Sequence, residues 1–312
     1  MRKAVVALGG NAILPKGSSG DIHEQFRNTR KSLESIIFLI KQGYNIAITH
    51  GNGPQAGNEL IKNELGRGIV PELPLGVIDA ATEGWMGYMI EQSLQNRLMQ
   101  EGIKKDVVTI PTQVLVDRND PAWNIPTKPV GPFMSKDEAK KLIERGYPVV
   151  EDAGRGWRRV VPSPKPREIV EKKIIKKLVD DGDIVIAAGG GGIPVYVEED
   201  GRLEGLDGVI DKDLASSVLA TDIGADILII LTAVPQVYLN FGKPGQKPIP
   251  KMTLSDARAF LQKGEFPAGS MGPKIEAACE FISKGGKEVL ITSLGTIVEA
   301  MSRNLGTRIV PD

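Results

Sequence analysis

The sequence predicts an α/β fold in which a mainly parallel sheet is covered by helices on both faces. Short, continuous apolar runs such as 4–8 and 45–49 are typical of strands that are buried on both sides. A segment of helical periodicity follows each of these runs, as in successive βαβ units. The 36 glycines and 21 prolines lie mainly at the ends of such segments, where they mark turns rather than disorder.

Strands and helices alternate through the first 110 residues. Asp21 and Glu24 have the spacing of a capping box, which predicts the start of a helix. Pro54 is tolerated at the first position of the next helix. The expected strands are 3–8, 45–49 and 106–110, and the expected helices are 21–43, 54–65 and 77–101.

Composition changes between residues 117 and 165. Four prolines fall within 117–132, so we do not expect a regular element there. A capping box at Ser135 then predicts a short helix. We interpret 117–165 as an insertion that stands out from the sheet edge and acts as a lid. The alternative is a solvated excursion without a role.

The alternation of strands and helices returns after residue 165. A hairpin over 193–210 is expected to turn at Asp200 and Gly201. The remaining expected strands are 183–188, 226–232, 288–292 and 308–310, and helices are expected near 166–181, over 211–222, within 248–263 and from 269 onwards.

Charge and composition exclude several classes of function. Lys plus Arg and Asp plus Glu both total 39, so the chain lacks the positive excess of a nucleic-acid binder. Cys279 is the only cysteine, which excludes an internal disulfide and suits a reducing compartment. We see neither a signal peptide nor an apolar run approaching ~18 residues. We therefore expect a cytoplasmic protein without nucleic-acid or membrane partners.

Two glycine loops follow the first two predicted strands. Gly9, Gly10 and Asn11 end the first strand, and Gly51-Asn52-Gly53 ends the second. Glycines let a backbone approach a ligand closely, and successive N–H groups can form an anion-binding nest. Two such loops at neighbouring strand ends suggest one anion site, although each loop by itself is also compatible with an ordinary turn.

The commonest nucleotide-binding motifs do not explain these loops. The chain has no Gly-x-x-x-x-Gly-Lys-Ser/Thr motif, and its first loop lacks the Gly-x-Gly-x-x-Gly spacing. The four glycines at 189–192 precede a predicted strand rather than a helix, which disfavours a dinucleotide fingerprint. A nicotinamide-dependent oxidoreductase is therefore disfavoured.

Three lysines occur in contexts that favour a bound anion. Lys128 lies between residues that proline holds extended. Lys212 and Lys274 lie at predicted helix starts, where the macrodipole disfavours a cation unless an anion is present. Any one of them alone could be a surface charge. Together they suit phosphoryl transfer, which needs positioning and positive charge. With only two histidines, an acceptor that is already an anion and needs no general base fits best.

Several blocks of the sequence resemble carbamate kinases, which belong to the amino-acid kinase fold family. The blocks occur in collinear order at 7–12, 49–55, 128–132, 154–164, 189–195, 209–215 and 269–274. The resemblance implies a three-layer αβα sandwich with an open, mainly parallel eight-stranded sheet, usually assembled as a homodimer. It also implies magnesium-dependent transfer, ATP + carbamate ⇌ ADP + carbamoyl phosphate, which often supplies ATP in arginine or ureide breakdown.

The same resemblance implies roles for individual residues. Those that would hold carbamate and the transferring phosphoryl group are Gly9, Gly10, Asn11, Gly51, Asn52 and Gly53. Those that would act in catalysis are Lys128, reaching over from the lid, Lys212 and Lys274 on the ATP phosphates, and Asp213 and Asp211, which position the lysines. Those that would contact the nucleotide are Gly190, Gly191, Lys212, Tyr238, Met271 and Lys274. Magnesium would be held through the ATP phosphates and not by dedicated protein ligands.

The resemblance further implies an approximate division of the single domain into a carbamate lobe, 1–181, which includes the lid, and a nucleotide-binding lobe, 182–312. The wider family often has a lysine two residues before its first glycine pair, where this chain has Ala7, so we expect Lys128 to supply that charge. Trp157, Arg158 and Arg159 stay open between ligand contact and packing of the lid. Two alternatives also remain: another kinase of this fold that phosphorylates a carboxylate or a nucleotide, and a non-catalytic nucleotide sensor.

Overall fold

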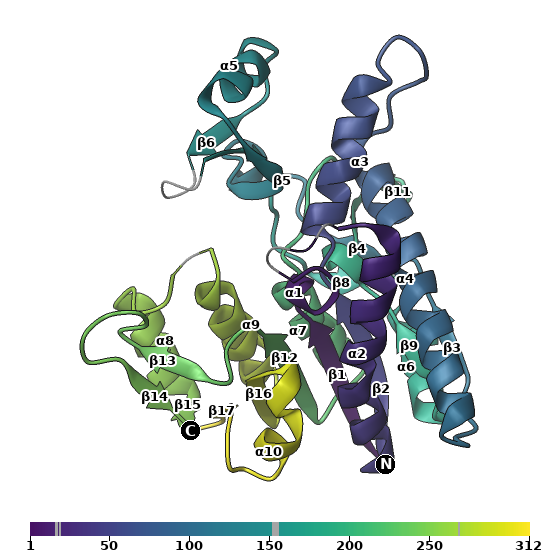
Figure 1. Ribbon diagram of the computed structural model, residues 1–312, viewed down its shortest axis with the longest axis vertical. Helices are drawn as coiled ribbons and strands as arrows, with labels where there is room; N and C mark the ends of the chain where they lie inside the picture. The colour runs from purple at the N-terminus through teal and green to yellow at the C-terminus, as the bar shows by residue number, and fades with distance from the viewer. Residues whose placement is uncertain (16–17, 19, 152–155, 268) are drawn as a thin grey trace.

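The computed structural model describes residues 1–15, 18, 20–151, 156–267 and 269–312, and its centre is one eight-stranded sheet (Figure 1). Each pair of neighbouring strands is parallel except β16 and β17. In order across the sheet the strands are β15 (Lys251–Thr253), β17 (Thr307–Val310), β16 (Glu288–Ser293), β12 (Ile227–Thr232), β1 (Arg2–Leu8), β2 (Tyr44–His50), β9 (Ile184–Ile186) and β3 (Val107–Thr109). The predicted mainly parallel sheet is confirmed.

Helices cover both faces of this sheet, which confirms the three-layer αβα architecture (Figure 1). One core contains side chains from α6 (Lys172–Asp181), α7 (Lys212–Asp222), α8 (Leu254–Gln262) and α9 (Met271–Ser283). The opposite core contains side chains from α2 (Ile22–Lys41), α4 (Leu75–Gln100) and α10 (Ile297–Met301). None of the described helices is both long enough and apolar enough to cross a membrane.

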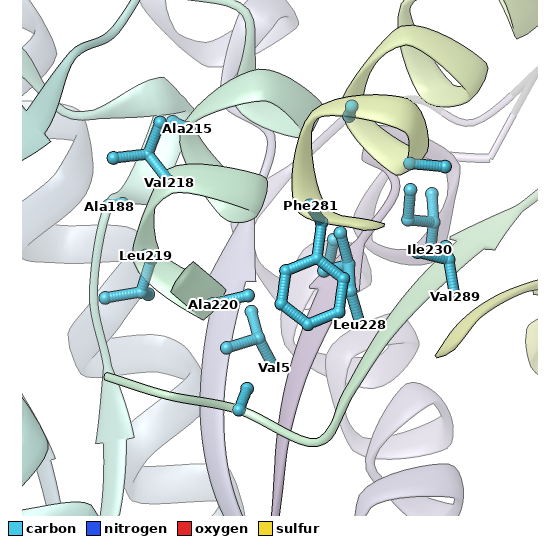
Figure 2. Packing of buried hydrophobic residues seen from close by; sticks show 14 of the residues in the cluster. Val5, Ala188, Ala215, Val218, Leu219, Ala220, Leu228, Ile230, Phe281 and Val289 are labelled. Carbon is cyan, nitrogen blue, oxygen red and sulfur yellow. The ribbon is translucent and has the colours of Figure 1, made fainter. Parts of the chain in front are cut away.

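Alternation along the central strands divides their side chains between these two cores. Val5 of β1 lies in the first core, and Val6 lies in the second. Figure 2 shows the first core, where Phe281 of α9 lies beside Leu228 of β12, and Ala220 of α7 lies near Val5. Because both faces are buried, the strands are continuously apolar, which explains why the sequence reveals them.

The segment 117–165 carries a small sheet of its own, in the order β5 (Lys128–Met134), β7 (Trp157–Val161) and β6 (Val149–Glu151). The helix α5 (Lys136–Glu144) packs against it and begins with the capping box expected at Ser135. Figure 1 shows this segment standing away from the eight-stranded sheet, beside α3 (Gly53–Leu65). We call it the protruding subdomain.

The strand β5 contradicts the expectation that 117–132 contains no regular element. It pairs on one side only, with β7, so it is an edge strand of the described sheet, where proline is tolerated. The pairing shifts register between Val130 and Met134, where Gly131 adopts a φ of +75° and Pro132 follows. A bulged edge strand can thus contain both Pro129 and Pro132, which a central strand would exclude because proline cannot donate a hydrogen bond to a neighbouring strand.

Two further expectations fail where strands are very short. The helix expected near 166–181 begins only at Lys172, because Glu168–Ile169 form β8, which pairs with β4 (Gln113–Leu115). Within 248–263, β14 (Lys247–Ile249) and β15 precede α8. Two or three residues are too few to show a periodicity. The hairpin expected over 193–210 is confirmed as β10 (Ile193–Val197) and β11 (Leu203–Gly205).

Arg158 and Arg159 serve largely for packing of the protruding subdomain. Arg158 donates hydrogen bonds to the carbonyl oxygen of Gly131, at 2.8 Å from Nη2, and its guanidinium lies over the Phe133 ring. Arg159 lies 4.1 Å from the centre of the Tyr147 ring and forms an ion pair with Glu64 of α3. These contacts tie β7 to β5, to the connection before β6 and to α3.

Backbone contact between Gly57 of α3 and Gly131 of β5 seats the subdomain. A Cβ atom on Gly57 would lie 2.0 Å from the Gly131 Cα and 2.4 Å from its N. No rotamer relieves such a clash, because the obstructing atoms belong to the backbone. The position of β5, and of Lys128 at its start, therefore depends on a glycine at 57.

We predict that Gly57→Ala displaces the subdomain while the rest of the fold persists. The kcat/KM of the phosphoryl transfer expected from the sequence should fall at least tenfold, which corresponds to a loss of about 1.4 kcal/mol or more in transition-state stabilisation. Steady-state kinetics and thermal unfolding would measure both effects. Gly84→Ala on α4 is the matched control, because nothing lies within 4 Å of its added Cβ, and alanine favours a helix by roughly 1 kcal/mol. Wild-type turnover in Gly57→Ala would contradict the role assigned to this contact.

Candidate active site

The two glycine loops lie side by side at the carboxyl ends of β1 and β2. The backbone N–H of Gly51 donates to the carbonyl oxygen of Leu8 at 3.2 Å, which joins the two strand ends. β1 continues into the short helix α1 (Gly10–Ile13), and β2 continues into α3 through Asn52. The side chain of Asn11 lies outside the described part of the structure. The adjacency expected of the two loops is thus present in the backbone.

Lys212 of α7 passes directly over the second glycine loop. A Cβ atom on Gly51 would lie 3.1 Å from the Lys212 Cδ and 3.6 Å from the N of Gly10. Glycine at 51 therefore leaves room for the lysine stem and for the close approach of the first loop. This packing brings Gly10, Gly51 and Lys212 together from three parts of the sequence.

The N-terminus of α7 links the protruding subdomain to the sheet. Asp211 is the N-cap of this helix, and its Oδ1 accepts from the backbone N–H of Asp213 at 2.9 Å. Its second oxygen, Oδ2, accepts from Lys128 Nζ at 2.6 Å. Asp211 thereby places Lys128 at the same helix end as Lys212.

Asp213 holds the other two lysines on either side of its carboxylate. Lys212 Nζ lies 2.5 Å from Asp213 Oδ1, and Lys274 Nζ of α9 lies 2.8 Å from Oδ2. Asp213 is 3% exposed. Burial alone would raise the pKa of Asp213, but the charges of Lys212 and Lys274 outweigh burial and hold the pKa well below its usual range. The structure therefore fixes two ammonium groups on one buried carboxylate.

A pocket of about 340 Å³ opens beside Lys274. Tyr238 of β13 (Val237–Leu239) and Met271 at the start of α9 line it, with Phe241 and Phe266. The rings of Tyr238 and Phe241 lie 5.9 Å apart between centroids. An apolar, aromatic pocket next to a lysine has the character of a site for a flat ring attached to an anionic group.

The glycine run at 189–192 packs against the second glycine loop and does not line the pocket beside Lys274. Gly190 and Gly191 are buried and are not among the residues that line the pocket beside Lys274. A Cβ atom on Gly190 would lie 2.2 Å from Asn52 Nδ2, and one on Gly191 would lie 2.3 Å from the carbonyl oxygen of Ile210. In the structure these two glycines let the chain pack on Asn52 and on the residue before Asp211.

A buried polar layer beneath the loops escaped the sequence analysis. It comprises His50 at the end of β2 and Asp79, Thr82 and Glu83 on α4, each 3% exposed or less. Glu83 accepts from the backbone N–H groups of Thr112 and Gly189, at 3.0 and 2.8 Å. The sequence signal was available: polar residues at 79, 82 and 83 occupy one helix face together with Met86 and Ile90.

Comparison with known proteins places this geometry in a family. The family model "Amino acid kinase family" matches residues 2–293. The chain belongs to the amino acid kinase family. Carbamate kinases of Thermococcus kodakarensis and Pyrococcus horikoshii are 49% and 48% identical to it, with 99% of each chain covered. A solved carbamate kinase from Giardia lamblia bound to AMP-PNP is 44% identical, with a TM-score of 0.92 over 100% of this chain and 99% of that one.

The carboxylates of Asp211 and Asp213 in this amino acid kinase are already engaged in ion pairs and hydrogen bonds. No group of three or more His, Cys, Asp or Glu side chains within the described residues is arranged to hold a metal ion. Asp211 is committed to Lys128 and to its own helix, and Asp213 is committed to two lysines. Such a donor set fits a cation that arrives bound to nucleotide phosphates.

Burial perturbs the ionisable groups of the buried polar layer in this amino acid kinase. Burial lowers the pKa of His50 to about 4, although its contact with the Gly51 carbonyl opposes the change. His50 Nε2 has no partner among the described residues. Burial also raises the pKa values of Asp79 and Glu83 to about 8. Near pH 7, His50, Asp79 and Glu83 are therefore mainly neutral, in contrast to the charged cluster of Lys128, Lys212, Lys274, Asp211 and Asp213.

We predict that the His50 ring stays neutral in the folded protein down to about pH 4. The unfolded chain binds this proton near pH 6.5, so His50 favours unfolding as the pH falls from about 6.5 to about 4. Asp79 and Glu83 act oppositely and favour unfolding as the pH rises towards 8, so bulk stability mixes the effects. NMR of labelled histidine, assigned with His23→Gln, isolates His50. A midpoint near pH 6.5 would contradict its sealed position.

Proposed function

We propose that this amino acid kinase catalyses reversible phosphoryl transfer between ATP and carbamate, giving ADP and carbamoyl phosphate. The observation that carries the proposal is the convergence of Lys128, Lys212 and Lys274 on two aspartates beside the paired glycine loops. Full-length identity of 46–49% to proteins named carbamate kinase supports the choice of acceptor. The named Giardia lamblia enzyme with AMP-PNP supports ATP as the donor.

Each part of the site then has a role in the transfer. The backbone of Gly9, Gly10, Gly51 and Gly53, with Asn11 and Asn52, would hold carbamate and the transferring phosphoryl group. Lys212 and Lys274 would neutralise charge on the β- and γ-phosphates, held at the right separation by Asp213. Asp211 would position Lys128, which would contact the phosphoryl group from the protruding subdomain.

The reaction requires no general base. Carbamate is already an anion, so one of its oxygens can attack the γ-phosphorus directly while the bond to the β-phosphate oxygen of ADP breaks. His50 is 0% exposed and its pKa lies near 4, which removes it as a base at the reacting atoms. Transfer in line, without a phosphoenzyme, is consistent with this inventory of side chains.

The nucleotide would lie along the pocket beside Lys274. Its adenine ring would pack between Tyr238 and Met271, and its phosphates would extend towards Lys212. Magnesium would enter with the nucleotide as part of the substrate and spread negative charge over the phosphate oxygens. Residues 1–181 would then form the carbamate lobe and 182–312 the nucleotide lobe, with the protruding subdomain as a lid.

The remaining biological expectations also belong to this proposal. A homodimer suits the apolar side chains that α4 exposes, among them Val77, Tyr88 and Met99. A cytoplasmic location suits Cys279, which is unpaired and buried, and whose pKa burial raises to about 11. Production of ATP during arginine or ureide breakdown would make use of the reverse direction.

We predict that the purified protein forms ATP from carbamoyl phosphate and magnesium-ADP, with kcat on the order of 1–100 s⁻¹ as is typical of kinases. A coupled luciferase assay measures it, with acetyl phosphate as a less matched donor in parallel. ATP formation from acetyl phosphate alone would indicate another carboxylate kinase of this fold. No ATP from folded protein that binds ADP tightly would instead indicate a nucleotide sensor and contradict the proposal.

A further inference from the structure

Asn52 lies at the junction of the second glycine loop and the buried polar layer. It is the N-cap of α3, between the two glycines of the second loop, yet its side chain makes no capping hydrogen bond to that helix. Instead its Nδ2 donates to Thr82 Oγ1 at 2.9 Å and to Asp79 Oδ1 at 3.3 Å. Both amide hydrogens are thus committed to α4.

The hydroxyl group of Thr82 determines which way the Asn52 amide faces. Thr82 Oγ1 donates its single hydrogen to the backbone carbonyl oxygen of Asp79, at 2.9 Å on the same helix. With that hydrogen used, Oγ1 can only accept a second hydrogen bond, and the Asn52 group that faces it must be the nitrogen. This argument holds whether Asp79 is neutral or charged.

Asn52 Oδ1 is then the polar atom that remains for a ligand. No described residue donates a hydrogen bond to it, and it is not among the fully buried polar atoms that lack a partner. Gly190 packs against the amide, where a Cβ atom would lie 2.4 Å from Asn52 Cγ, and so restricts its movement. Between Gly51 and Gly53 the loop therefore carries an amide oxygen that is held in one orientation and receives no hydrogen bond from the described residues.

We propose that Asn52 Oδ1 accepts a hydrogen bond from the amino group of the substrate, and that Thr82 is the positioning residue that holds it in this orientation. This inference rests on the proposed function. Such an acceptor favours an acyl group that carries –NH₂ over one of the same shape that carries –CH₃, which cannot donate. Selectivity for carbamoyl over acetyl phosphate would thus arise from Asn52 and the buried polar layer and not from the charged lysines.

The chemistry at phosphorus is unchanged by this contact. When carbamoyl phosphate reacts, the bond from phosphorus to the carbamoyl oxygen breaks, and a bond to a β-phosphate oxygen of ADP forms. Carbamate leaves as an anion with its amino group intact, so the hydrogen bond to Oδ1 persists through the transfer. A contact equally strong in the ground and transition states alters KM rather than kcat.

The test compares kcat/KM for carbamoyl phosphate and acetyl phosphate in wild type, Thr82→Val and Thr82→Ser. Valine removes the shorter of the two hydrogen bonds that orient the amide and leaves only the 3.3 Å contact with Asp79 Oδ1, so Nδ2 is no longer held away from the substrate amino group. We expect the ratio of the two kcat/KM values to fall about tenfold, through a higher KM for carbamoyl phosphate. Serine keeps the hydroxyl group and is expected to retain the wild-type ratio.

Thr29→Val is the matched control for loss of a buried threonine hydroxyl group. Thr29 is 1% exposed, and its Oγ1 has no partner among the described residues, so the change removes no hydrogen bond and should leave the ratio intact. If Thr82→Val does not fold, Thr82→Ala is scored in the same way.

The outcomes separate this inference from the proposed function. A folded Thr82→Val or Thr82→Ala with a ratio within about twofold of wild type would overturn the inference and leave carbamate phosphorylation standing. Equal use of the two donors by wild type would also overturn it. A wild-type protein that forms ATP from neither donor would overturn both. A reduced ratio that serine restores would support the assignment of Thr82 and Asn52.

Discussion

The arrangement of the site depends on one buried carboxylate that two lysines share. Asp213 is held at the start of α7 by its neighbour Asp211, and it receives Lys212 from its own helix and Lys274 from α9. Without the charge of Asp213, two ammonium groups would stand close together in a buried setting, and breaking such a buried pair costs about 3–5 kcal/mol. The carboxylate therefore holds two positive charges close together in a buried position even when no anionic ligand is bound. Phosphoryl transfer needs that charge preorganised, because the charge on the transferring group spreads during the reaction.

Close backbone packing at glycines brings the other parts to this charge. Gly51 lets the Lys212 stem pass, Gly57 admits β5 with Lys128, and Gly190 allows the chain to press on Asn52. In each case a Cβ atom would lie 3.1 Å or less from a neighbouring atom, so these glycines act through the atoms that they leave out. The charged side of the site and its buried polar side are thus held by the same kind of contact. Without these close contacts, the long side chains of Lys128 and Lys212 would not be confined to one position.

The sequence predicted the fold well where elements are long and buried on both sides, as with β1, β2, α2 and α4, because continuous apolar runs and caps mark them. It missed β5, β8 and β14, which are short or lie at edges, where pairing partners decide the conformation. Lys128, Lys212, Lys274, Asp211 and Asp213 were named from helix starts and resemblance, and the structure brings them together. Thr82 and Glu83 were missed, because their roles arise from contacts with residues 29 or more positions away.

The most direct test of this account is the turnover and nucleotide binding of Asp213→Asn. An amide keeps the shape of the side chain but removes the charge that orients the two lysines. We expect kcat to fall by about 100-fold or more, while the Kd for magnesium-ADP changes by less than about tenfold, because the lysines remain but lose their fixed separation. Asp222→Asn, at the other end of α7, is the control, since an amide oxygen can still accept from the Ile169 N–H. A folded Asp213→Asn protein with wild-type kcat would contradict the central role of this carboxylate.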